Sequence, residues 1–235
     1  MKIGVIGGNG VAATNRLCDI VERKLTASGA FRDAHHPEMI VWQATSAPSR
    51  SMFLEGRGPD WRPDYIRIAK MFKSIGCDLG CMCCNTAHYA VKEVSEGSGL
   101  PFINLLEEVA LAAKATGVER FEIFCSDGLR KFDLYGKAFA KVFPEAEVVY
   151  PSDERQKQVT ETICGVKNKS RLEGMANLMR LQKLIEEAEA PVVLGCTDLR
   201  VAYPNDVWPV GGKLVVDSLE VLADAIIRRM KEAGV

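Results

Sequence analysis

The stretch KIGVIGGNG at residues 2–10 decides the fold class, because a short apolar run leads directly into a glycine-rich turn. Residues 2–6 suit a buried strand, and the glycines behind them allow a tight turn. A helix is predicted from about residue 12 to residue 28. Strand, glycine turn and helix form one β–α unit, from which parallel sheets are built.

The same alternation continues along the chain. The first half predicts strands at residues 2–6, 38–44, 77–82 and 101–104, and helices at 12–28, 64–75, 85–96 and 105–116. The second half predicts strands at 121–125, 147–150, 191–194 and 214–216, and helices at 129–142, 154–190 (broken near 168–170) and 218–233. Between the second strand and the next helix, the long connection at 45–63 is typical of a lid or binding loop.

This repeated order predicts an α/β fold of two similar lobes. Each lobe would be a parallel four-stranded sheet flanked by helices, and a pseudo-two-fold would relate the two. We expect residues 1–104 plus 217–235 to form the first lobe and residues 105–216 to form the second.

The composition excludes several classes of protein. The 235 residues include 30 Lys+Arg against 31 Asp+Glu, which leaves no basic excess for binding nucleic acid. The apolar runs are far shorter than the roughly 18 residues of a membrane span, so no membrane partner is expected. Because Met1 leads directly into the first strand without the pattern of a signal peptide, we expect a cytoplasmic protein.

Eight cysteines are many for a reducing compartment, where thiols serve as core residues, metal ligands or nucleophiles. Cys18 and Cys164 lie in helical patterns, and we expect both side chains to be buried. Cys84 follows the third strand of the first half, and Cys196 follows the third strand of the second half, 112 residues later. Open α/β sheets bind ligands at the carboxyl ends of their strands, so these two cysteines would face each other across one cleft.

Two facing thiols can invert a carbon centre held between them. A thiolate on one face removes the proton, and a thiol on the other face returns one. We expect the helical segments after Cys84 and Cys196 to favour the thiolate at either position, while the reaction needs one cysteine charged and the other neutral. Two ordinary buried thiols would fit the same positions, and the spacing alone leaves both interpretations open.

Four segments resemble the aspartate/glutamate racemase family, and the match runs nearly end to end. They are IGVIGGNG at 3–10, CNTAH at 84–88, LGCTD at 194–198 and VVDS at 215–218. The resemblance implies two α/β lobes with the active site between them, assembled as a homodimer. It implies that Cys84 and Cys196 are the acid/base pair of a racemase acting on a small amino acid, aspartate or glutamate. That family needs no cofactor, and no metal is expected.

The resemblance also places other side chains around the substrate. Arg50 and Lys167 fall where the family has basic residues at the mouth of the site, where they would hold a carboxylate; solvated surface charges are the alternative. The predicted substrate-binding residues are Asn9, Gly10, Arg50, Asn85, Thr86, Ser126, Lys167, Thr197 and Asp198.

The chain departs from the family at some of these positions. Asn9 replaces the methionine of the usual Gly-Gly-Met-Gly-Pro start, and Asp198 stands where glutamate is commoner. Ser126 lies in a turn that usually carries threonines, and residues 44–50 lack the usual paired asparagines. Since these positions surround the substrate, the sequence predicts the mechanism more firmly than the amino acid.

Other motifs carry less weight. Cys77, Cys81 and Cys84 have the spacing of the iron–sulfur motif of radical SAM enzymes, but a strand would point the thiols to opposite faces. The glycines at 8 and 10 imitate a dinucleotide fingerprint, yet the second strand ends without an acidic residue. His88, four residues after Cys84, suits a structural role.

Two other functions stay open at this stage. One is another cysteine-dependent enzyme of the superfamily, a cis–trans isomerase or decarboxylase of a small dicarboxylate. The other is a non-catalytic small-molecule binding protein of the same fold. The presence of both thiols disfavours the decarboxylases, which use one cysteine.

Overall fold

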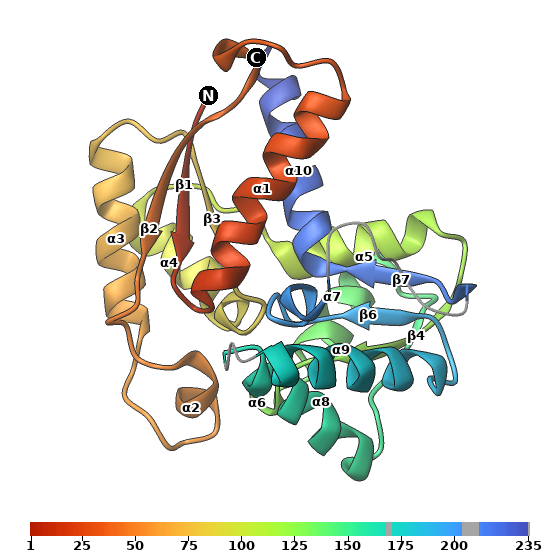
Figure 1. Ribbon diagram of the computed structural model, residues 1–235. Helices are drawn as coiled ribbons and strands as arrows, with labels where there is room; N and C mark the ends of the chain where they lie inside the picture. The colour runs from red at the N-terminus through yellow and green to blue at the C-terminus, as the bar shows by residue number, and fades with distance from the viewer. Residues whose placement is uncertain (168–170, 204–211, 235) are drawn as a thin grey trace.

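The computed structural model describes residues 1–167, 171–203 and 212–234, and its strands form two parallel sheets (Figure 1). The first sheet has the order β2-β1-β3, and the second has the order β5-β4-β6-β7. The strands are β1 Lys2–Gly7, β2 Glu38–Gln43, β3 Leu79–Met82, β4 Arg120–Phe124, β5 Glu147–Val149, β6 Val192–Leu194 and β7 Val215–Asp217. The α/β fold with two parallel sheets flanked by helices is confirmed.

The first sheet has three strands, not the four that the sequence predicted. Residues 101–104 contribute a single parallel bridge between Phe102 and Gly80. Pro101 has no N–H to donate, so only its carbonyl and the Ile103 N–H bond to Gly80, at 2.8 and 2.9 Å. With Phe102 counted beside β3, both sheets follow the same order.

Helices cover both sheets. They are α1 Val11–Ala27, α2 Arg50–Leu54, α3 Arg62–Ser74, α4 Val91–Ser98, α5 Leu105–Ala115, α6 Asp127–Lys131, α7 Leu134–Val142, α8 Asp153–Gly165, α9 Arg171–Glu186 and α10 Ser218–Glu232. Among the described residues, the 3₁₀ turns with defined bounds are η1 Asp33–His35, η2 Thr86–Ala90 and η3 Leu199–Ala202. None of the described helices is both long and apolar enough to cross a membrane.

Three helical predictions differ from the structure in detail. The connection at 45–63 contains α2, which begins after Ser49, whose hydroxyl accepts a hydrogen bond from Met52 N–H. The predicted helix 85–96 is divided into η2 and α4, and the predicted helix 129–142 is divided into α6 and α7 at Asp133, which has φ 48°. The break predicted near 168–170 lies outside the described residues.

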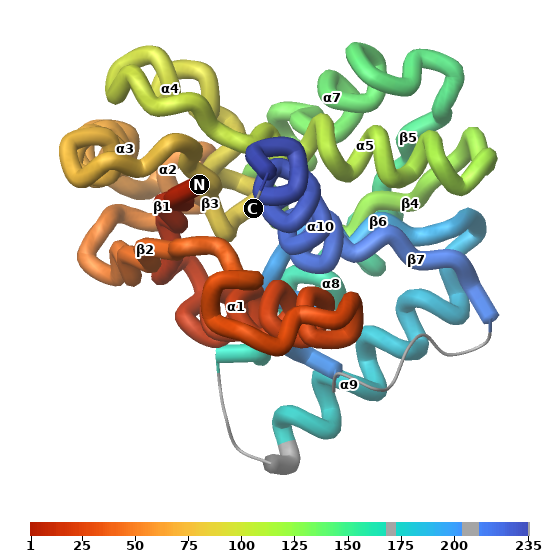
Figure 2. Tube along the Cα trace, turned by 90° about the horizontal axis from the view of Figure 1, so that it is seen from above, coloured from red at the N-terminus to blue at the C-terminus, as the bar shows by residue number. Residues whose placement is uncertain are grey.

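The largest apolar core joins the two halves. Ile3 and Leu17 of the first half pack in one cluster with Phe121 of the second half and with Ile226 of α10. Figure 2 shows α10 between α1 and α5, where it returns from β7 to the first half of the chain. The division into residues 1–104 plus 217–235 and residues 105–216 stays a prediction.

A buried ion pair fixes the turn that follows β6. The Arg200 guanidinium of η3 lies 3.2 Å from the Asp217 carboxylate at the end of β7, and both side chains are buried. Arg200 also contacts Glu220 at 3.1 Å, and the Tyr203 hydroxyl donates to Asp217 at 2.6 Å. These contacts hold η3, and with it the residues just before it, against the second sheet.

Candidate active site

The two cysteine motifs meet where the two sheets face each other. The carboxyl ends of β1 and β6 both point toward the centre of the molecule (Figure 1). The Thr197 hydroxyl donates to the Cys83 carbonyl at 3.4 Å, and the hydroxyls of Thr86 and Ser126 are 2.9 Å apart. Segments more than 100 residues apart in sequence therefore form one site.

Close backbone packing sets the position of Cys196. Gly195 N–H donates to the Phe124 carbonyl at 2.8 Å, which extends the ladder of β4 and β6 by one residue. A Cβ atom at residue 195 would lie 2.6 Å from the Tyr135 ring, so only glycine fits there. The backbone after β6 is thus pressed onto α7, and Cys196 follows at the sheet edge.

The cysteines differ in exposure. Cys84 and Cys196 are half-buried, whereas Cys77, Cys81, Cys83 and Cys125 are buried. The prediction that Cys18 and Cys164 are buried is wrong for Cys164, which is exposed, while Cys18 is half-buried. The buried face of α8 carries Gln156, Val159 and Thr162, and residue 164 falls on the opposite side of the helix.

The surroundings of Cys196 favour the neutral thiol. Burial raises the pKa of Cys196 well above its ordinary value, and the charges of Asp198 and Cys84 raise it further. A hydrogen bond from the Asp198 N–H lowers it, but by less. The expectation that the thiolate is favoured is therefore wrong for Cys196, because burial and the Asp198 charge oppose the thiolate more than the Asp198 N–H stabilises it.

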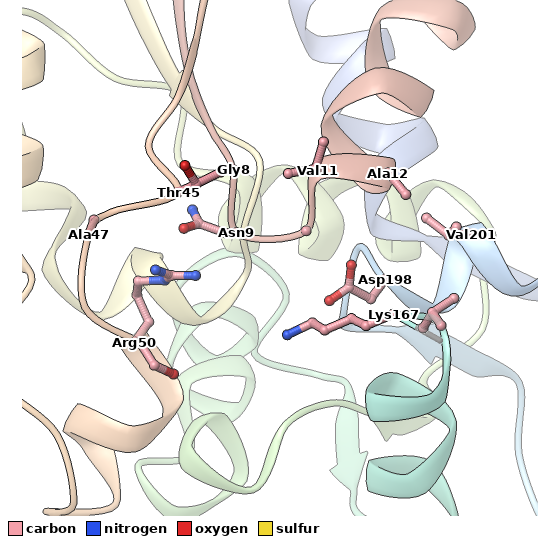
Figure 3. A pocket seen from close by; sticks show the side chains of 13 residues that line it. Gly8, Asn9, Val11, Ala12, Thr45, Ala47, Arg50, Lys167, Asp198 and Val201 are labelled. Carbon is pink, nitrogen blue, oxygen red and sulfur yellow. The ribbon is translucent and has the colours of Figure 1, made fainter. Parts of the chain in front are cut away.

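A cavity of about 400 Å³ opens beside the two motifs (Figure 3). This volume lies within the range of small-molecule sites. The cavity is lined by residues of both halves: Gly8, Asn9, Gly10, Val11, Ala12, Thr45, Ala47, Ser49, Arg50, Val166, Lys167, Asp198 and Val201. Five of the predicted substrate-binding residues are among them, while Thr45 and Ser49 were missed in a segment predicted only as a long loop.

Two cations enter the cavity from opposite sides. Arg50 is the first residue of α2, and its guanidinium donates to the Pro48 carbonyl at 2.8 Å. Lys167 follows α8 and is exposed, with its ammonium group directed into the cavity (Figure 3). Burial raises the pKa of Asp198 to about 6, although the charges of Lys167 and Arg50 lower it.

Gly10 and Asp198 are in close contact. A Cβ atom on Gly10 would lie 2.0 Å from Asp198 Oδ1, so any larger residue would displace the carboxylate. Asp198 is buried, and it connects the glycine turn after β1 to the turn after β6. The absence of a side chain at residue 10 thus allows the two halves to close on the cavity.

Both polar atoms of the Asn85 side chain form hydrogen bonds within the protein. Its amide donates to the Ser218 hydroxyl at 2.9 Å and accepts from the Tyr135 hydroxyl at 2.6 Å. All three side chains are buried. Asn85 therefore ties η2 to α7 and α10.

His88 supports the backbone of Cys84. Its Nδ1 lies 2.8 Å from the Cys84 carbonyl, and burial lowers the pKa of His88 to about 4. The imidazole is therefore neutral at physiological pH, in the structural role that the sequence suggested. Within the described ranges, no group of three or more His, Cys, Asp or Glu side chains could hold a metal ion.

The fold and the site together define a two-lobed α/β racemase. The family model for Asp/Glu/Hydantoin racemase matches residues 3–226, and the chain belongs to this family. The protein is accordingly an isomerase, an amino-acid racemase, as the resemblance of its four motifs implied.

Three similar proteins illustrate the match. The broad specificity amino-acid racemase RacX of Bacillus subtilis (strain 168) is 24% identical over 212 residues, covering 86% of this chain and 88% of that protein. The Picrophilus torridus aspartate racemase superposes with a TM-score of 0.81 at 22% identity, covering 97% of this chain and 93% of the other. An aspartate racemase homologue from Pyrococcus horikoshii OT3 gives 0.70 at 23% identity, covering 98% and 99%. Both structures share the fold.

Proposed function

We propose that the protein racemises aspartate or glutamate without a cofactor, by passing protons at Cα between Cys84 and Cys196. The observation that carries this proposal is the hydrogen bond from Thr197, next to Cys196, to the carbonyl of Cys83, next to Cys84, which brings the two cysteine turns into contact. Among the cysteines at the strand ends, Cys84 and Cys196 are half-buried, while Cys83 and Cys125 are buried.

The two thiols divide the proton transfer. Because the pKa of Cys196 is raised, Cys196 holds its proton in the resting enzyme and acts as the acid. In the proposed cycle, Cys84 acts as the base that takes the Cα proton, and Cys196 delivers its own proton to the opposite face. The product leaves with inverted configuration, and the enzyme then carries the proton on Cys84. The other enantiomer reacts from this second state, in the reverse direction.

Hydroxyl groups from both halves suit the α-carboxylate. Thr86 and Ser126 share one hydrogen bond, which leaves one of their two hydroxyl protons to donate, while the Thr197 hydroxyl already donates to the Cys83 carbonyl and holds the site together. Negative charge spreads onto the α-carboxylate as the proton leaves, and donors already in position stabilise it. We assign Asn85 a positioning role here, since its amide is engaged by Ser218 and Tyr135.

The cations favour a substrate with a second carboxylate. Arg50 and Lys167 bring positive charge to the cavity from its two sides, with Asn9 on the side of Arg50 (Figure 3), and Gly10 also lines the cavity. Asp198 lies on the side of Lys167 and, with a pKa of about 6, is mostly ionised at neutral pH. Two cations against one carboxylate leave a net positive cavity, which suits aspartate or glutamate.

Loss of the Cα–H NMR signal in D₂O, followed with each common amino acid, tests this function. We expect exchange and racemisation with one or both acidic amino acids. Cys84→Ala and Cys196→Ala should each lower the rate of racemisation by about 10³-fold or more. Cys164→Ala, an exposed cysteine on α8, is the matched control and should leave the rate unchanged. Absence of exchange with every amino acid would refute the proposal.

The predictions of a homodimer and of a cytoplasmic location belong to the same proposal. Sedimentation of the purified chain at twice its monomer mass would confirm the first. Recovery of the untagged protein in the cytoplasmic fraction of its cell would confirm the second.

A further inference from the structure

A second pocket lies between α8 and α9, and no described residue lines both this pocket and the substrate cavity. It has a volume of about 360 Å³, and its lining includes Glu161 and Cys164 of α8 and Glu173, Asn177 and Arg180 of α9. This volume lies within the range of small-molecule sites. The pocket contains the exposed thiol of Cys164, which the proposed racemisation does not use.

The side chain of Asn177 brings an unpaired donor to this pocket. Only 4% of Asn177 is exposed. Arg180 Nη1 donates to Asn177 Oδ1 at 3.1 Å, whereas Asn177 Nδ2 has no acceptor within the described chain. A Cβ atom on Gly165 would lie 2.4 Å from Oδ1 and 2.6 Å from Nδ2, so the amide is pressed against the residue that follows Cys164. Because native proteins leave few buried donors unpaired, Nδ2 indicates a ligand that supplies an acceptor.

The charged groups of the pocket match an amino-acid zwitterion. The Arg180 guanidinium and Asn177 Nδ2 are both donors, and an ionised carboxylate only accepts hydrogen bonds. The carboxylates of Glu161 and Glu173 suit an ammonium group on the same ligand, and Arg180 Nε lies 3.7 Å from the Glu161 carboxylate. The pocket therefore combines groups for both ends of a zwitterion with the thiol of Cys164.

We propose that Cys164 is a site of thiol–disulfide exchange with the disulfide of an amino-acid thiol, and that the half-disulfide left on Cys164 hinders racemisation at the neighbouring cavity. The Cys164 thiolate attacks one sulfur of the disulfide, so a new S–S bond forms as the old one breaks. The other half leaves as a thiolate and takes up the proton that Cys164 lost. Cys164 is oxidised and the disulfide is reduced. Asn177 and Arg180 hold the carboxylate of the half that stays.

The end of α8 connects this pocket to the substrate cavity. Gly165 lines the pocket, and the next two residues, Val166 and Lys167, line the cavity, with the Lys167 ammonium group directed into it (Figure 3). A group bound to Cys164 in the last turn of α8 therefore displaces Lys167, and small displacements of such groups lower reaction rates. The effect on racemisation rests on the proposed function, whereas the exchange reaction at Cys164 does not.

Cystine and hydroxyethyl disulfide test the site, because both carry a disulfide but only cystine carries carboxylates and ammonium groups. Peptide mapping by mass spectrometry gives the rate at which each disulfide forms an adduct with Cys164. The measured quantity is the ratio of the cystine rate to the hydroxyethyl disulfide rate. We expect this ratio to be at least about fivefold higher in the folded protein than in the urea-unfolded chain, where the pocket does not exist.

Two variants remove the donors of the pocket. Arg180→Met and Asn177→Leu should each lower the ratio toward that of the unfolded chain, because the carboxylate of cystine loses a partner. Lys183→Met is the matched control, since it removes another cation of α9, whose partner is Glu187 at 3.7 Å, and it should keep the ratio of the parent protein. A ratio in the folded parent within about twofold of the unfolded value would overturn the site, as would unchanged ratios in both variants.

Racemisation assays of cystine-treated protein test the effect on the cavity. Cys164→Ala treated in the same way measures the loss caused by adducts on Cys84 and Cys196, which are half-buried. The loss of kcat/KM in the parent protein should exceed that loss by at least about threefold and should be reversed by dithiothreitol. Equal losses in the two proteins would overturn the effect on racemisation. If no amino acid is racemised, the proposed function fails, and the ratio of adduct rates still decides whether the site at Cys164 exists.

Discussion

The turns that follow β3 and β6 occupy equivalent places in the two sheets but are built from different chemistry. In the first turn, residues 83–88, the anchors are neutral: His88 bonds to the Cys84 carbonyl, and Asn85 bridges Ser218 and Tyr135. In the second turn, residues 195–200, the anchor is the buried ion pair of Arg200, and a carboxyl group at Asp198 lies beside the thiol.

This contrast shows how one backbone pattern can place two thiols in different surroundings. Burial and the Asp198 charge raise the pKa of Cys196, so the second turn favours a proton donor. In the first turn, the neutral His88 bonds to the Cys84 carbonyl, and no carboxylate stands at the position that Asp198 holds in the second turn. A two-base racemase needs such an asymmetry, because one thiol must be charged while the other is not.

The largest expected effect concerns the anchor of the second turn. Arg200→Met leaves the Asp217 carboxylate buried without its cation and should lower the free energy of unfolding by about 3–5 kcal/mol. Urea denaturation measures the change. Lys92→Met, which removes an exposed pair with Glu96, should change it little. A loss below about 1 kcal/mol for Arg200→Met would show that the second turn does not depend on the ion pair.

A smaller effect is expected where the two turns close on the cavity. Gly10→Ala places a Cβ atom 2.0 Å from Asp198 Oδ1, so the carboxylate or the turn must move, at a cost of about 1–3 kcal/mol. The matched control is Gly174→Ala in α9, where nothing lies within 4 Å of the added atom, and stability should rise by up to about 1 kcal/mol. Equal stability of the two variants in urea would contradict the close contact.

The smallest expected effect is a change in the reactivity of Cys196, the thiol that lies beside Asp198. Asp198, with a pKa of about 6, is ionised above that pH and opposes the thiolate of Cys196. Asp198→Asn removes this charge, so the pKa of Cys196 should fall and its alkylation at pH 8 should be several-fold faster. Mass spectrometry of both cysteines measures the rates. If Cys196 is alkylated no faster in Asp198→Asn than in the parent protein, the Asp198 charge does not control the pKa of this thiol.

Local pattern predicted most of the strands and helices within a few residues, but it failed where a single backbone feature intervened. Pro101 reduced a predicted strand to one bridge, and Asp133 in the left-handed region divided a predicted helix. Cys164 was expected to be buried because its segment looked helical, yet it lies on the outer face of α8. Helical periodicity indicates that one face is buried, and a short window does not indicate which one.

The residues of the candidate site also differ in whether the sequence could predict their roles. Cys84 and Cys196 could be placed at one cleft from sequence, because the carboxyl ends of parallel strands share an edge. Asn85 could not be recognised as an internal tie, since its partners Ser218 and Tyr135 come from distant helices. Thr45 and Ser49, which line the cavity, gave no sequence signal, because their segment was predicted only as a long loop.

The sequence by itself determined the order of strands and helices, the glycine turn after β1 and the two cysteines at strand ends. These features follow from local geometry, because side-chain direction and turn conformation depend on near neighbours in the chain. Only the tertiary structure decided that burial and the Asp198 charge raise the pKa of Cys196 and that Arg50, Lys167 and Asp198 line one cavity. Burial and charge act through space, and the groups that set them come from segments far apart in sequence.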